Sequence, residues 1–171
     1  MKYLLRVGAF LCITGFLSSG PALRAEKDQA PKIKTSTIQV DMIQSDEPRV
    51  PMEFKVALYE RLIQQLEKRG FQHVYREGDS NASRAADLIV LHSTVRGFKR
   101  GSEEARQVTT VAGATSISVH CQFTNTEGKV LLERDVTGRV RFFGGNLRAT
   151  YDFAKKASRV ASEYFSSPAS K

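Results

Sequence analysis

The stretch SISVHCQFTNTEGKVLLERDVTGRV, residues 116–140, decides the fold, because it holds two alternating runs with a turn between them. Every second residue of the first run is apolar: Ile117, Val119, Cys121 and Phe123. The second run alternates in the same way from Val130 to Val140, and the intervening NTEG ends in a glycine, as hairpin loops often do. Successive strand residues point to opposite faces. We therefore predict two antiparallel strands with one apolar and one polar face.

His120 and Cys121 are the chain's only neighbouring histidine and cysteine, a pair that suggests a thiolate nucleophile or a metal site. The alternation sends the two side chains to opposite faces, so His120 is out of reach as a base for Cys121. Burial among apolar neighbours also raises the pKa of a thiol, which disfavours the thiolate. Gly138, in the middle of the second strand, predicts a bulge or a close backbone approach.

The segments before the hairpin supply three more predicted strands. ADLIVLHSTVRGF, residues 86–98, begins as an apolar run and ends as an alternation. FQHVYRE, residues 71–77, is a short strand. STIQVDMI, residues 36–43, alternates with three apolar residues on one face: Ile38, Val40 and Met42.

Two amphipathic helices complete the pattern. The first is predicted over MEFKVALYERLIQQLEKRG, residues 52–70, and ends at Gly70. Its apolar stripe has steps of three and four and consists of Val56, Tyr59, Ile63 and Leu66. The last helix follows Asn146, a candidate N-cap, and has a similar stripe: Phe153, Ala157, Val160 and Tyr164.

The predicted order is β-α-β-β-β-β-α. This is a single α+β domain over residues 35–166, with a mostly antiparallel sheet of about five strands and two helices on one face. The charged segment KRGSEEARQ, residues 99–107, is predicted to be a mobile loop. About 145 residues suffice for one domain with its own core.

Residues 1–25 have the layout of a secretory signal peptide: a basic start, the apolar run VGAFLCITGFL and small residues after it. The apolar run is shorter than the roughly 20 residues that span a bilayer. Cleavage after Ala25 is expected, with cleavage after Ala22 and an uncleaved anchor as alternatives. We then predict a flexible lead over residues 26–34 and a polar tail over residues 167–171. After cleavage the protein is expected to be periplasmic or secreted.

Without residues 1–25, the chain keeps 23 basic and 18 acidic side chains, a net charge of +5. A basic balance favours anionic partners. An exported protein rarely meets nucleic acid, so we expect an envelope protein or an anionic envelope component as the partner, and a membrane contact only through the signal peptide. Cys121 is then the single cysteine, so no disulfide forms within the chain.

The candidate binding residues are those of the polar sheet face and the basic loop: His92, Arg96, Lys99, Arg100, Arg106 and His120. The sequence has no H-x-H, HExxH, C-x-x-C or G-x-S-x-G spacing, and VTTVAGATS lacks the Gly-Lys-Ser/Thr ending of a phosphate loop. We predict no catalytic residue, metal or cofactor. Two alternatives stay open: a metal or small-ligand binder that uses the polar face, and a hydrolase whose residues meet only in the folded chain.

Residues from Ala86 to Phe165 resemble an exported bacterial family catalogued as domain of unknown function 4410. The resemblance lies in ADLIVLHSTVRGF, in the hairpin VAGATSISVHCQFTNTEGKVLLE and in FFGGNL before the closing helix. The helix that ends at KRGF extends it to roughly residues 33–165. The chain departs from the family at His120-Cys121 and in having few glycines before the hairpin.

This resemblance implies an exported α+β domain, similar in layout to small domains of envelope lipoproteins and assembly factors. It carries no catalytic residues that could be transferred. We therefore expect a non-enzymatic binding or assembly module of the bacterial envelope.

Overall fold

The computed structural model describes residues 34–108, 113–141 and 145–165. The predicted signal peptide, most of the predicted lead and the predicted polar tail lie outside these residues. The elements follow in this order: β1 (Thr37–Val40), β2 (Gln44–Ser45), α1 (Met52–Lys68), β3 (His73–Arg76), the 3₁₀ turn η1 (Ala82–Arg84), β4 (Ile89–Lys99), α2 (Glu103–Val108), β5 (Thr115–Asn125), β6 (Val130–Val140) and α3 (Arg148–Tyr164).

The six strands form one mixed sheet in the order β3-β1-β4-β5-β6, with β2 also paired to β4. The long strands β4, β5 and β6 pair antiparallel, whereas the short strands β1, β2 and β3 pair parallel with their neighbours. β1 and β3 pair parallel, and α1 supplies the long crossover connection that a parallel pair needs. The predicted α+β class and single domain are confirmed.

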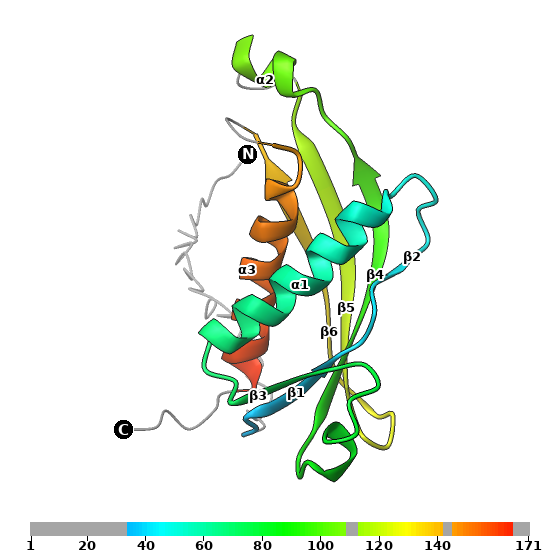
Figure 1. Cartoon of the computed structure of the whole chain (residues 1–171), viewed down its shortest axis with the longest axis vertical. Helices are drawn as coiled ribbons and strands as arrows, with labels where there is room; N and C mark the ends of the chain where they lie inside the picture. Colours follow the sequence, from blue (N-terminus) through cyan, green and yellow to red (C-terminus); the bar gives the residue numbers. More distant parts are fainter. Residues whose placement is uncertain (1–33, 109–112, 142–144, 166–171) are drawn as a thin grey trace, which may run out of the picture. The chain divides into compact units, whose positions relative to one another are not determined.

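Both long helices cover the same face of the sheet (Figure 1). The buried side chains of this face and of both helices form one core cluster, in which the largest fully buried side chains include Phe54, Phe123, Phe153 and Phe165. The opposite face of β4, β5 and β6 carries no helix of the described chain, and we call it the open face. No helix among the described residues is long and apolar enough to cross a membrane.

Three residues predicted on apolar faces are exposed, and one of them is Val130, which is 44% exposed at the start of β6. Met42 is 50% exposed, because β1 ends at Val40 and the chain detours before β2 resumes pairing with β4; Ile43 is buried instead. Val56 is 49% exposed, because the buried stripe of α1 is shifted around the helix. That stripe consists of Phe54, Leu58, Tyr59, Leu62, Ile63, Gln65 and Leu66.

Two local predictions also change. Residues 99–107, predicted as a loop, begin with the last residue of β4 and include most of the short helix α2, which lies in the connection between β4 and β5 (Figure 1). The N-cap of α3 is Leu147 rather than Asn146. The Asn146 side chain instead accepts a hydrogen bond from the Thr115 hydroxyl at 2.5 Å, so it ties the start of α3 to β5.

Gly138 confirms the predicted close approach. A Cβ atom at this position would lie 2.7 Å from Phe153 Cβ and would overlap the Ala149 carbonyl oxygen. Because Gly138 has no side chain, α3 can pack directly against β6 at this position.

Candidate functional site

The open face presents two rows of side chains that cross the three long strands. The register pairs His92 with Gln122 and Gln122 with Glu133 in one row, and Thr94 with His120 and His120 with Asp135 in the other. His92 and His120 thus share a face, as predicted, but lie in different rows.

Each histidine of the open face contacts its own carboxylate. His92 Nδ1 lies 2.8 Å from Asp41 Oδ2, and His120 Nδ1 lies 2.8 Å from Asp135 Oδ1. Each imidazole therefore has an acid of its own as its nearest charged partner. No cluster of three or more metal-ligating side chains occurs among the described residues.

Arg96 lies apart from both rows. The pairing of β4 with β5 shifts between Val95 and Gly97, so Arg96 is the extra residue of a β-bulge, and it is exposed. The bulge changes which residues of β4 face the core, and Phe98 packs edge-to-face on Phe54 with ring centroids 4.9 Å apart. Arg106 belongs to α2, and its side chain lies outside what the structure describes.

Lys99 and Arg100 line a pocket of about 520 Å³ at the end of β4, together with Arg49, Pro51 and Phe98. The loop between β2 and α1 lies beside the end of β4 (Figure 1), and it contributes Arg49 and Pro51 to the pocket lining. We call this the basic pocket. Three of its five lining residues are cationic and none is acidic; the other two, Pro51 and Phe98, are apolar, and we call them the floor.

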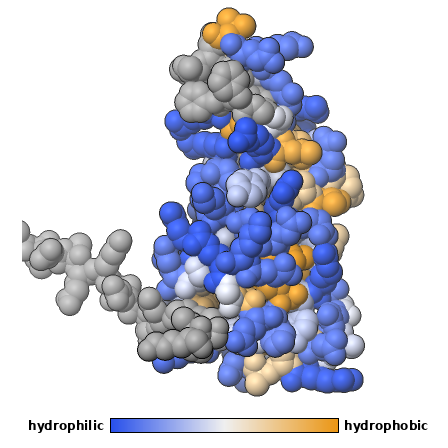
Figure 2. Space-filling view, turned by 60° about the vertical axis from the view of Figure 1, so that its left-hand side comes forward, coloured by the Kyte–Doolittle hydropathy of each residue, from blue (hydrophilic) through white to orange (hydrophobic). Residues whose placement is uncertain are grey.

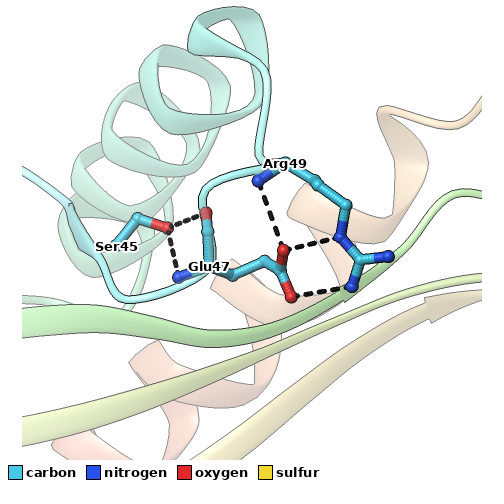
Figure 3. Close-up of polar contacts among 3 residues, drawn as sticks. All are labelled: Ser45, Glu47 and Arg49. Atoms are coloured by element: carbon cyan, nitrogen blue, oxygen red, sulfur yellow. Dashed lines mark hydrogen bonds and ion pairs between the residues drawn. The ribbon is translucent and has the colours of Figure 1, made fainter.

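A carboxylate outside the pocket lining holds Arg49 in place (Figure 3). Glu47 accepts two hydrogen bonds from the guanidinium, at 2.8 Å from Nε and 3.0 Å from Nη2, and a third from the Arg49 backbone N–H. The Ser45 hydroxyl donates to the Glu47 carbonyl oxygen and accepts from the Glu47 backbone N–H. The hydrogen bonds from Arg49 lower the pKa of Glu47, so the carboxylate form is favoured.

Sequence reasoning found Lys99 and Arg100 but missed Arg49, Pro51 and Phe98. The available signal was DEPRVP, residues 46–51, in which Glu47 and Arg49 flank Pro48 and the stretch ends at Pro51. Nothing in that spacing indicates that the loop lies beside the end of β4, because the contact depends on the sheet order.

The predicted inertness of Cys121 agrees with its surroundings. The residue lies on the core face of β5 with 1% exposure, opposite Ser93 of β4. Burial raises the pKa of the thiol to about 12, which keeps it protonated at neutral pH. His120 lies on the other face of the sheet, so the two neighbours form no catalytic pair.

A second pocket, of about 450 Å³, lies where α3 meets the edge strand β6 and is lined by Thr137, Arg139, Arg141, Asp152 and Lys156. Asp152 accepts a hydrogen bond from the Arg139 backbone N–H at 2.9 Å, and Lys156 donates to the Thr137 carbonyl oxygen at 3.0 Å. These two side chains also pair with each other at 2.6 Å. They therefore satisfy backbone groups on the outer edge of β6.

No protein-family model matches this sequence, and no curated protein matches it. Solved structures do match. The PelC dodecamer from Paraburkholderia phytofirmans aligns at a TM-score of 0.59 and 14% identity, over 78% of this chain and 91% of the other. A single-substitution variant of that PelC, also a dodecamer, aligns at 0.58 and 13% identity, over 80% and 92%. An uncharacterized protein aligns at 0.50 and 14% identity, over 78% and 95%. At these identities the likeness concerns architecture, and the chain shares the fold of the PelC proteins.

Proposed function

We propose that this chain is an exported protein of the bacterial envelope that acts as a non-enzymatic binding or assembly module, and that a partner protein docks on its open face. The supporting observation is the construction of that face. Three strands of eleven residues expose polar side chains without a covering helix from the described chain, and neither of the two pockets described above contains His92 or His120.

The side chains of the open face are held in pairs, as a docking surface of defined shape requires. Ser118 and Thr137 hydroxyls lie 3.1 Å apart, and the Gln122 amide donates to Glu133. Together with the two histidine–carboxylate pairs, these contacts leave few side chains that must lose freedom when a partner binds, which lowers the entropic cost of association.

The surface properties also favour a polar contact. The view in Figure 2 shows mainly hydrophilic residues, with the hydrophobic ones in small separate groups. The exposed large hydrophobic residues are likewise distributed over several elements of the described chain: Met42, Met52, Val56, Val108, Val130, Leu147 and Tyr151. Non-obligate protein interfaces are about as polar as the rest of a protein surface.

The comparisons suggest which partner to test first. The similar PelC proteins are dodecamers, so a second copy of this chain is the first candidate and a different envelope protein the second. The resemblance to domain of unknown function 4410, carried by the strand, hairpin and glycine-rich segments, supports an exported accessory role.

A charged side chain in the middle of the open face tests the proposal. Ser118→Arg places a long cation where a partner would lie, and Gln64→Arg introduces the same residue at an exposed position of α1. Mass measurement in solution reports self-association, and crosslinking in periplasm followed by pull-down reports other partners. We expect Ser118→Arg to abolish the association that the wild type and Gln64→Arg retain.

Association that survives Ser118→Arg unchanged, in a protein with wild-type circular dichroism, would contradict docking on the open face. A wild type that is monomeric and recovers no stoichiometric partner would contradict the assembly role itself.

A further inference from the structure

The basic pocket is built to hold an anion. Lys99 and Arg100 are exposed at the end of β4, and neither has an ion-pair partner within the described residues. Arg49 uses Nε and Nη2 for Glu47, so Nη1 keeps its N–H donors for another acceptor (Figure 3). Three cationic groups therefore surround a volume typical of small-ligand sites.

The floor of the pocket is apolar and fixed. Phe98 is held by its edge-to-face contact with Phe54, a core residue of α1 that is 1% exposed. Pro51 immediately precedes α1 and has the φ of −63° that its ring imposes. A ligand that fits this floor has a ring or hydrocarbon part beside its anionic group.

We infer that the basic pocket binds a phosphate monoester carried on a sugar or a lipid. A phosphate monoester has a charge between about −1.5 and −2 and three acceptor oxygens, which match three cationic donors better than the two oxygens of a carboxylate do. Arginine binds phosphate through paired N–H donors, and lysine contributes a point charge. The inference goes beyond the docking role proposed above and uses different residues.

The binding experiment removes two of the three cations. Lys99→Gln/Arg100→Gln is compared with Lys68→Gln/Arg69→Gln, an equally basic exposed pair at the end of α1 that lies outside the pocket lining. Both double variants change the net charge by the same amount, so nonspecific electrostatic attraction falls equally in the two.

Calorimetry with glucose 1-phosphate and with glucose tests the soluble source, and flotation with phosphatidylcholine vesicles, with or without phosphatidic acid, tests the lipid source. We expect the pocket variant to bind at least tenfold more weakly than the wild type in the arm that binds, and the α1 variant to stay within about twofold. Glucose and pure phosphatidylcholine should not bind. The arm that binds identifies the source of the phosphate.

Arg49→Lys keeps the charge but replaces the guanidinium fork by one ammonium group, which Glu47 would engage. We expect this variant to bind the phosphorylated probe more weakly at unchanged net charge. Wild-type affinity would show that the Arg49 guanidinium does not contact the phosphate. The inference is overturned if neither phosphorylated probe binds the wild type, or if the pocket variant and the α1 variant weaken binding equally.

Discussion

Cys121 shows how one strand position sets the chemistry of a side chain. Its thiol is 1% exposed, and burial raises its pKa to about 12. The thiolate is the reactive species, so the native thiol should be nearly inert at about pH 8. We expect a thiol reagent to label Cys121 slowly in the native protein and rapidly in urea, measured on a chain without residues 1–25 so that Cys12 does not contribute.

The comparison with urea is the control for this prediction, because unfolding restores an ordinary thiol with full access to the reagent. Stoichiometric labelling of the native protein at the rate seen in urea would show that Cys121 does not face the core.

Gly138 is the second residue at which a single atom matters. Alanine would bring Cβ to 2.8 Å from the Phe153 backbone nitrogen and into the Ala149 carbonyl oxygen, both on α3. Backbone atoms of a packed helix move aside only at a cost, so we expect Gly138→Ala to lower the free energy of unfolding by about 3 kcal/mol. Urea denaturation measures the change.

Gly97→Ala is the matched control on the neighbouring part of the sheet. Its new Cβ would have Ser118 Cβ as its nearest neighbour, at an ordinary 3.7 Å. We expect a loss of about 1 kcal/mol or less, because no atom has to move aside. Equal effects of the two substitutions would mean that the close approach of α3 to β6 does not determine the result.

At the scale of the element, α3 closes the outer edge of β6 over part of its length. Asp152 and Lys156 hydrogen bond to the backbone of Arg139 and Thr137, and Arg134 Nη1 donates to the Glu133 carbonyl oxygen at 2.9 Å. Edge strands with unpaired backbone groups invite pairing with another chain. These charged side chains make β6 a poor site for strand addition, which supports the proposal that a partner docks on the open face instead.

Asp152→Ala should release this closure. The Arg139 N–H loses its acceptor and Lys156 keeps only the Thr137 carbonyl oxygen, so we expect stability to fall by about 1–2 kcal/mol and the Arg139 amide to exchange faster with solvent. Arg159→Ala breaks an exposed pair with Glu163 at 3.7 Å on the same helix and should cost less than about 0.5 kcal/mol. Unchanged exchange at Arg139 would contradict the closing role of Asp152.

The sequence predicted the elements whose pattern is local. The period of two places Cys121 and His120 correctly, because both residues pair with β4 on one side and β6 on the other and the alternation around them is unbroken. The predicted burial of Met42 is wrong because the strand ends just before it. The predicted burial of Val56 is wrong because tertiary packing, not spacing alone, selects the buried stripe of α1. The local pattern was therefore enough to predict the hairpin, whereas the burial of Met42 and Val56 depends on how the elements pack together.

The basic pocket likewise has residues that the sequence predicted and residues that it did not. Lys99 and Arg100 were predictable as basic residues after a strand, whereas Arg49 enters the pocket from a loop about fifty residues earlier in the chain. Charge can be read from the sequence residue by residue, but convergence of charges depends on which strands are neighbours. The same reasoning applies to His92 and His120, which share a face but contact different carboxylates.

At the scale of the whole molecule, the described chain has one sheet face that packs in the core, an open polar face for which we propose a partner, and a basic pocket at the end of β4. The docking proposal places the protein in the envelope, and that placement depends on residues 1–25, which lie outside the described residues. Export is therefore the prediction on which the biological setting rests.

We expect the full chain, produced in a Gram-negative host, to appear in the periplasmic fraction with Glu26 at its N-terminus, because Ala25 is a small residue of the kind that processing requires before the cleaved bond. A start at Leu23 would indicate the alternative cleavage after Ala22. Ala22→Asp/Ala25→Asp removes both small residues and should leave an uncleaved precursor at the membrane. N-terminal sequencing and fractionation give the answer, and a cytosolic protein of full length would contradict the export of this chain and with it the envelope role.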